Sequence, residues 1–154
     1  TGEDRYRRGM YTFWRRTTPY PTFVIFDAPD RSECMVARSR TITPLQALVT
    51  MNEPLFVDAA RAFGRRIANE ESADVDKRLI FAFRVAVARE PNDAELAVLR
   101  KTFVAQRDHY AKNKEAAASL VSAAASEKMN IVETAAWIVL ANTLLNLDET
   151  ITRE

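Results

Sequence analysis

Apolar side chains recur every three or four residues from Thr43 onward, and this spacing constrains the fold more than any other feature of the sequence. A period of three to four residues places apolar side chains on one face of an α-helix, whereas a strand alternates every second residue. Thr43 before Pro44 is a typical helix start, and Asn92 or Asp93 offers another. The sequence therefore predicts a mainly α fold, a single-domain bundle of about five to six helices.

The periodic segments give approximate bounds for these helices. We expect them over residues 44–51, 54–69, 74–88, 92–112, 114–125 and 131–146. In the first of them, Leu45, Leu48 and Val49 share one side. The third is apolar nearly all round between Leu79 and Val87, which predicts a central, buried helix.

Residues 1–42, which we call the lead-in, lack this order and are rich in arginine and aromatic residues. The spacing of Tyr6, Met10 and Phe13 predicts a short helix over 7–16. The run of β-branched and aromatic residues at 22–26 predicts a strand or an extended segment. We therefore expect one domain over 1–154, in which an irregular, extended lead-in (1–42) lies over a helical core (43–154), and we expect the chain to be part of a larger protein.

Composition excludes several classes of function. The formal net charge of +1 argues against a nucleic-acid or anionic-membrane binder. No stretch approaches the roughly 20 apolar residues of a membrane span. Cys34 is the single cysteine, so the chain has no CxxCH motif for c-type haem, and His109 is the single histidine. We expect no metal site and no cofactor in this piece, a buried Cys34, and His109 near a helix C-terminus.

The lead-in carries the candidates for acid–base chemistry: Asp27, Asp30, Arg31 and Arg40. One interpretation is that its arginines pair with these carboxylates and fix an irregular segment. The other is that the four residues act as acid–base or anion-holding groups in a site shared with the upstream chain. The first interpretation is the more common arrangement, and the second stays open.

Two further pairs are candidates for ligand binding. Trp14 and Tyr20 stand among arginines, and aromatic residues with arginine form protein interfaces or stack on sugar rings, so polysaccharide is a candidate partner. Asn142 and Asn146 are four residues apart and share a helix face. Buried amides need hydrogen-bond partners, so we expect this pair to tie the last helix to loop backbone around Asn52; one wall of a polar pocket is the alternative.

Six short motifs occur in a fixed order along the chain. They are Tyr11-Thr-Phe-Trp-Arg-Arg-Thr17, Phe26-Asp-Ala-Pro-Asp-Arg31, Arg40-Thr-Ile-Thr-Pro-Leu-Gln-Ala-Leu48, Met51-Asn-Glu-Pro54, Ala88-Arg-Glu-Pro-Asn-Asp-Ala-Glu-Leu96 and Leu140-Ala-Asn-Thr-Leu-Leu-Asn-Leu-Asp-Glu149. Together they resemble the domain of unknown function 1553 of planctomycete cytochrome-linked proteins, over nearly the whole chain and as the C-terminal part of that domain.

The resemblance implies a setting but no chemistry. Members of this family are large, exported or envelope-associated proteins that often carry a separate c-type cytochrome motif and a second uncharacterised domain upstream. No activity and no catalytic residues are implied. We therefore expect a non-catalytic structural or interaction module that packs against upstream domains of an exported, periplasmic protein. The alternative is part of a carbohydrate-related hydrolase or oxidoreductase.

Overall fold

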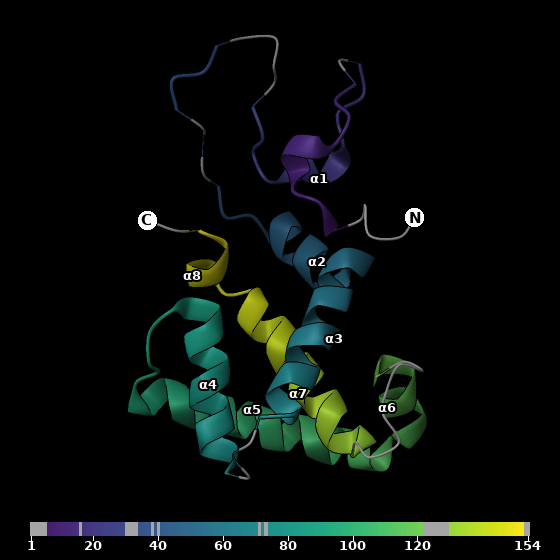
Figure 1. Cartoon of the computed structure of the whole chain (residues 1–154), viewed down its shortest axis with the longest axis vertical. Coiled ribbons are helices and arrows are strands. Elements are labelled where there is room, and N and C mark those ends of the chain that lie inside the picture. Colours follow the sequence, from purple (N-terminus) through teal and green to yellow (C-terminus); the bar gives the residue numbers. More distant parts are fainter. Residues whose placement is uncertain are drawn as a thin grey trace.

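The computed structural model describes residues 6–15, 17–29, 34–37, 39, 41–70, 72, 74–121 and 130–152. All regular secondary structure in these residues is helical, which confirms the mainly α prediction (Figure 1). The elements are η2 (Gly9–Tyr11), α1 (Pro21–Ile25), α2 (Pro44–Asn52), α3 (Pro54–Ala68), α4 (Val75–Val87), α5 (Asp93–Lys112), α6 (Lys114–Val121), α7 (Ile131–Leu145) and α8 (Asp148–Ile151).

The helix starts follow the capping residues of the sequence. Thr43 and Gln46 form a capping box at α2, and Asn92 forms another with Glu95 at α5. Asp74 caps α4 by accepting a hydrogen bond from a backbone N–H of the first turn. Each cap satisfies helix N–H groups that have no partner inside the helix. These caps explain why the predicted starts of α2, α4 and α5 agree with the structure.

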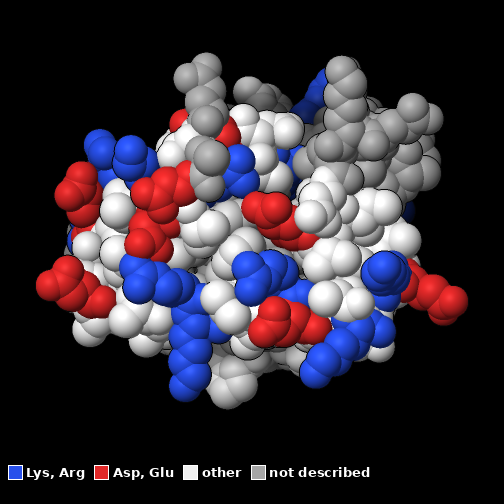
Figure 2. Space-filling view, turned by 90° about the horizontal axis from the view of Figure 1, so that it is seen from below, with Lys and Arg blue, Asp and Glu red and all other residues white. Residues whose placement is uncertain are grey.

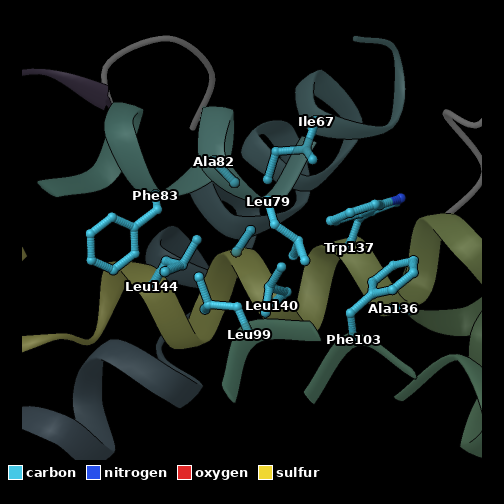
Figure 3. Packing of buried hydrophobic residues seen from close by; sticks show 11 residues of the cluster. Ile67, Leu79, Ala82, Phe83, Leu99, Phe103, Ala136, Trp137, Leu140 and Leu144 are labelled. Carbon is cyan, nitrogen blue, oxygen red and sulfur yellow. The ribbon is translucent and has the colours of Figure 1, made fainter. Parts of the chain in front are cut away.

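Helix α7 is the centre of the fold. Eight of its residues are buried, including Trp137, whose ring stacks on that of Phe103 with 4.0 Å between centroids. Helices α3, α5 and α6 pack along it. Figure 3 shows side chains of α3, α4 and α5 converging on its surface. At Gly64 of α3, an added Cβ would lie 2.6 Å from the Cα of Ile138, so only glycine permits this close approach to α7.

The prediction that the segment 79–87 is the central helix was wrong. Helix α4 buries Leu79, Ala82 and Phe83 against the core, whereas Val85 is 42% exposed. The segment 79–87 is apolar except for Arg84, but the first turn of α4 contains the charged residues Asp76, Lys77 and Arg78, whereas α7 is apolar nearly all round.

The lead-in also differs from its prediction. Instead of a helix over 7–16 the structure has the 3-10 turn η2, and instead of a strand at 22–26 it has the one-turn helix α1. Pro21 favours a helix start, and Asp27 adopts the left-handed conformation (φ 55°) that ends one. The N–H groups of Asp27 and Ala28 donate to the carbonyls of Val24 and Phe23, as in a Schellman motif.

Three smaller points complete the comparison. Cys34 is exposed, so the prediction that it is buried was wrong. His109 lies in the last turn of α5, as expected. The short α8 was not predicted, and residues 122–125 of the predicted fifth helix lie outside the described residues. No helix in the described part of the chain is both long and apolar enough to cross a bilayer.

Candidate functional site

Asp27 joins the lead-in to the start of α2. Its Oδ2 accepts hydrogen bonds from the backbone N–H of Thr41 over 2.8 Å and from the Thr41 hydroxyl over 2.7 Å. The side-chain amide of Gln46, which is buried, donates to the carbonyl of Ile25 over 2.8 Å and to the Thr41 hydroxyl oxygen over 3.2 Å. The motifs at 26–31 and 40–48 therefore meet in one polar junction, formed by Asp27, Thr41 and Gln46.

The other three acid–base candidates, Asp30, Arg31 and Arg40, lie outside the described residues. The structure does describe the environment of Asp27. One oxygen of its carboxylate receives two short hydrogen bonds from Thr41. These bonds fix the turn that follows α1. This geometry gives Asp27 a structural task in the polar junction.

The paired amides of α7 contact α2. Asn142 Nδ2 donates to the carbonyl of Met51, the neighbour of Asn52, over 3.3 Å. The hydroxyl of Thr50, which is buried, makes a short hydrogen bond to Asn146 Oδ1. The contact of Asn146 is thus with a side chain and not with loop backbone. These bonds connect the motif at 51–54 with the motif at 140–149.

The two aromatic candidates of the lead-in meet at one ring. Trp14 stacks on Phe23 with 5.5 Å between centroids and an interplanar angle of 11°. Tyr20 meets the same ring edge-on at 5.4 Å and stays 50% exposed. Sequence reasoning did not predict this arrangement, because it expected an extended segment at 22–26, where the structure has the helix α1.

Helix α2 has the reverse of the usual polarity. Its two buried residues are Gln46 and Thr50, whereas Leu45 is 52% and Leu48 is 58% exposed. A surface helix normally buries its apolar face. Here the hydrogen bonds of the buried polar pair hold the helix to α1 and α7. Leu45 and Leu48 therefore point outward, whereas Val49, predicted to share their side, is half-buried.

The exposed apolar residues are concentrated in the same part of the chain. Among the described residues, seventeen large apolar or aromatic side chains are exposed, and twelve of them lie between residues 6 and 51. We call these twelve the N-terminal apolar set: Tyr6, Met10, Tyr11, Phe13, Tyr20, Val24, Met35, Val36, Ile42, Leu45, Leu48 and Met51. Sequence reasoning identified Trp14 and Tyr20 as candidates but did not identify this concentration.

A second polar cluster joins the start of α5 to α8. The guanidinium of Arg89 donates to both carboxylate oxygens of Glu95 (2.7 and 2.9 Å), to both of Glu149 (2.8 and 3.0 Å) and to the carbonyl of Glu90. All five N–H groups of the arginine are thereby used. The hydrogen bonds from Arg89 lower the pKa of Glu95 to about 2, with a further contribution from the Asn92 N–H, and lower that of Glu149.

This Arg89 cluster borders an open pocket of about 510 Å³. Its apolar lining includes Phe83, Leu99 and Leu147, and the guanidinium of Arg89 lies 4.9 Å above the Phe83 ring. The motifs at 88–96 and 140–149 meet here, although their ion-paired residues Arg89 and Glu149 are 60 positions apart in the chain. Because of that separation, no local pattern in the sequence indicates the contact.

The face that Figure 2 shows has no large patch of a single charge sign. Lysine and arginine side chains are interspersed there with aspartate and glutamate. In the part of the chain that the structure describes, no three His, Cys, Asp or Glu side chains are grouped as metal ligands would be.

Comparison with protein families places the chain beside known sequences. The model of the family described as "PSD1: Protein of unknown function (DUF1553)" matches residues 1–103. No curated protein and no solved structure matches the chain. The match ends inside α5, while α7, which lies beyond it, fills the centre of the core, so the folded unit is larger than the matched segment. The chain belongs to this family of proteins of unknown function, DUF1553.

Proposed function

We propose that this domain is a non-catalytic interaction module that packs against other domains of a large, exported, multidomain protein. The observation that carries the proposal is the N-terminal apolar set, which holds twelve of the seventeen exposed large apolar side chains of the described residues. Concentrated apolar exposure marks surfaces that bind other proteins, because water solvates such surfaces poorly.

The way α2 is held supports this role. Gln46 and Thr50 fasten the helix through hydrogen bonds, so the fold does not need Leu45 and Leu48 for its own core. Aromatic residues and methionine, which are frequent in this set, are enriched at protein interfaces. A stable scaffold that directs apolar residues outward is what a docking surface requires.

The partner and the location follow from the family resemblance. We infer that the partners are upstream domains of the same polypeptide, that this protein is planctomycete, and that its c-type cytochrome region lies outside this piece. The location would then be periplasmic or otherwise exported, with this domain as the C-terminal part of the family's unit. The interspersed charges in Figure 2 disfavour nucleic acid as a partner, since a polyanion selects a continuous basic surface.

A carbohydrate-related enzyme, with its site shared with the upstream chain, is the second candidate. The cluster of Trp14 and Tyr20 around Phe23 favours it, because partly exposed aromatic rings can stack on sugars. One oxygen of Asp27 is already engaged by two hydrogen bonds from Thr41, which assigns this carboxylate a structural task.

Hydrogen exchange in the full-length protein tests the proposal. Peptides from residues 6–51 should exchange at least tenfold more slowly in the full-length protein than in the isolated domain. The double substitution Leu45→Ser and Leu48→Ser should remove this protection. Val98→Ser, at an exposed apolar position of α5, is the matched control and should leave it intact.

Equal exchange of residues 6–51 in the two proteins would reject the docking role. Retention of the full-length protein on a polysaccharide matrix, lost in the Tyr20→Ala variant, would favour the carbohydrate alternative instead.

A further inference from the structure

Helix α4 has a partly exposed outer face. Lys77, Ile80, Phe81, Arg84 and Val85 line a shallow groove of about 550 Å³ on this helix alone. Their spacing of three, one, three and one residues is that of a single helix face. The opposite face of α4 packs on the core, as Figure 3 shows for Leu79, Ala82 and Phe83.

The groove has a cationic border. Lys77 and Arg84 belong to its lining, and the guanidinium of Arg66, from α3, lies 5.4 Å above the Phe81 ring. In the described part of the chain, neither Lys77 nor Arg66 has a carboxylate within salt-bridge distance. Arg84 contacts Glu90 at 3.4 Å, with both side chains more than 60% exposed, and such surface pairs are weak.

Helix α4 is amphipathic: Leu79, Ala82 and Phe83 are buried, and Val85 on the outer side is 42% exposed. Among the described residues, Ile80 and Phe81 beside it are half-buried. An apolar stripe flanked by cations complements an apolar stripe between carboxylates, and opposite charges at an interface select the partner and its orientation.

We propose that the outer face of α4 binds an amphipathic helix that carries Asp or Glu beside its apolar stripe. The partner helix lies along the groove, with its apolar residues against Ile80, Phe81 and Val85. Its carboxylates pair with Lys77 and Arg84. This mode is helix-in-groove recognition, in which apolar anchors supply affinity and flanking charges supply selectivity.

This surface is distinct from the N-terminal apolar set. Helix α4 lies toward one end of the molecule and α1 toward the other (Figure 1). Loss of either binding activity would therefore leave the other intact, and the two proposals can fail separately.

Two stapled helical peptides with the same leucine stripe test the proposal, one flanked by glutamate and the other by lysine. The acidic peptide should bind the isotope-labelled protein at least tenfold more tightly in fluorescence anisotropy. Raising the salt concentration should weaken it, because screening reduces attraction between exposed charges. Amide chemical shifts should change along residues 77–85.

Charge reversal adds a sharper readout. The double substitution Lys77→Glu and Arg84→Glu should switch the preference to the basic peptide, while Lys101→Glu, an exposed lysine on α5, should not. Circular dichroism spectra that match the unsubstituted protein show that the variants fold. Four outcomes would each overturn the proposal. They are equal affinity for the two peptides, no binding of either, chemical-shift changes centred on α2, and self-association of the protein through α4.

Discussion

The helical core and the N-terminal region use similar side chains for opposite purposes. All sixteen buried hydrophobic residues of the described chain lie between Ala60 and Leu144, on helices α3 to α7. The N-terminal apolar set lies between residues 6 and 51, where hydrogen bonds of Asp27, Gln46 and Thr50 fix the backbone. Apolar content alone therefore does not identify a core. In α2, the hydrogen bonds of the polar residues determine which side of the helix is buried, and the apolar side chains then face outward.

The two tryptophans give the sharpest test of this difference. Trp137 is fully buried against Phe103, so Trp137→Ala should lower the free energy of unfolding by about 3–5 kcal/mol. Trp14 stacks on Phe23 in the lead-in, and Trp14→Ala should cost about 1 kcal/mol or less. Urea unfolding followed by circular dichroism measures both. Equal losses would mean that the lead-in is part of the cooperative core.

Two glycines offer a smaller contrast of the same kind. A Cβ at Gly64 would meet the backbone of Ile138 at 2.6 Å, so Gly64→Ala should destabilise the domain by about 1–3 kcal/mol. A Cβ at Gly9 would meet only the ring edge of Phe23 at 2.9 Å, and a side chain can move away. Gly9→Ala should change the thermal midpoint much less. A Gly64→Ala variant as stable as the unsubstituted protein would show that α3 and α7 are not in close contact.

In α2, replacing a polar residue should lower the free energy of unfolding more than replacing a neighbouring apolar residue, which is the reverse of the usual order. Gln46→Ala removes the partner of the Ile25 carbonyl and one half of the capping box, with an expected cost of about 1–3 kcal/mol. Leu45→Ala removes an exposed side chain and should cost about 0.5 kcal/mol or less. If the apolar substitution proves more costly in urea unfolding, then α2 packs by its apolar face.

The smallest expected effect is a change in thermal stability at acidic pH. The folded-state pKa of Glu95 is lowered to about 2 from an ordinary value of 4.5, mainly by hydrogen bonds from Arg89. A lowered pKa contributes stability above pH 4.5 that is lost as the pH falls toward about 2. Glu95→Gln should therefore flatten the decline of the thermal midpoint over this window. Glu115→Gln, at an exposed carboxylate of α6, is the control and should leave the slope unchanged.

Much of the helical core was predictable because its signals are local. The Thr43–Pro44 start, the capping residues Asp74 and Asn92, and the three-to-four-residue apolar period act within a few positions. The lead-in was not predictable by the same means. The run at 22–26 has the composition of a strand, and its helical ending depends on the left-handed conformation of Asp27.

The site features depend on contacts between distant positions. Thr50 with Asn146 and Arg89 with Glu149 join residues 96 and 60 positions apart, and a single sequence carries no signal for such pairs. The outward direction of Leu45 and Leu48 was hidden for a related reason. Their spacing fits a buried face as well as an exposed one, and the choice is made by the hydrogen bonds of Gln46 and Thr50.

The central place of α7 has a consequence for biosynthesis. A ribosome makes residues 54–112 before residues 131–145, so α3, α4 and α5 emerge without the surface on which they pack. Ile67, Leu79 and Phe103 then stay open to water until Trp137 and Leu140 have been added. Transiently exposed apolar surface makes such nascent chains prone to aggregation. We therefore expect this domain to depend on chaperones during translation more than a bundle whose central helix is made first.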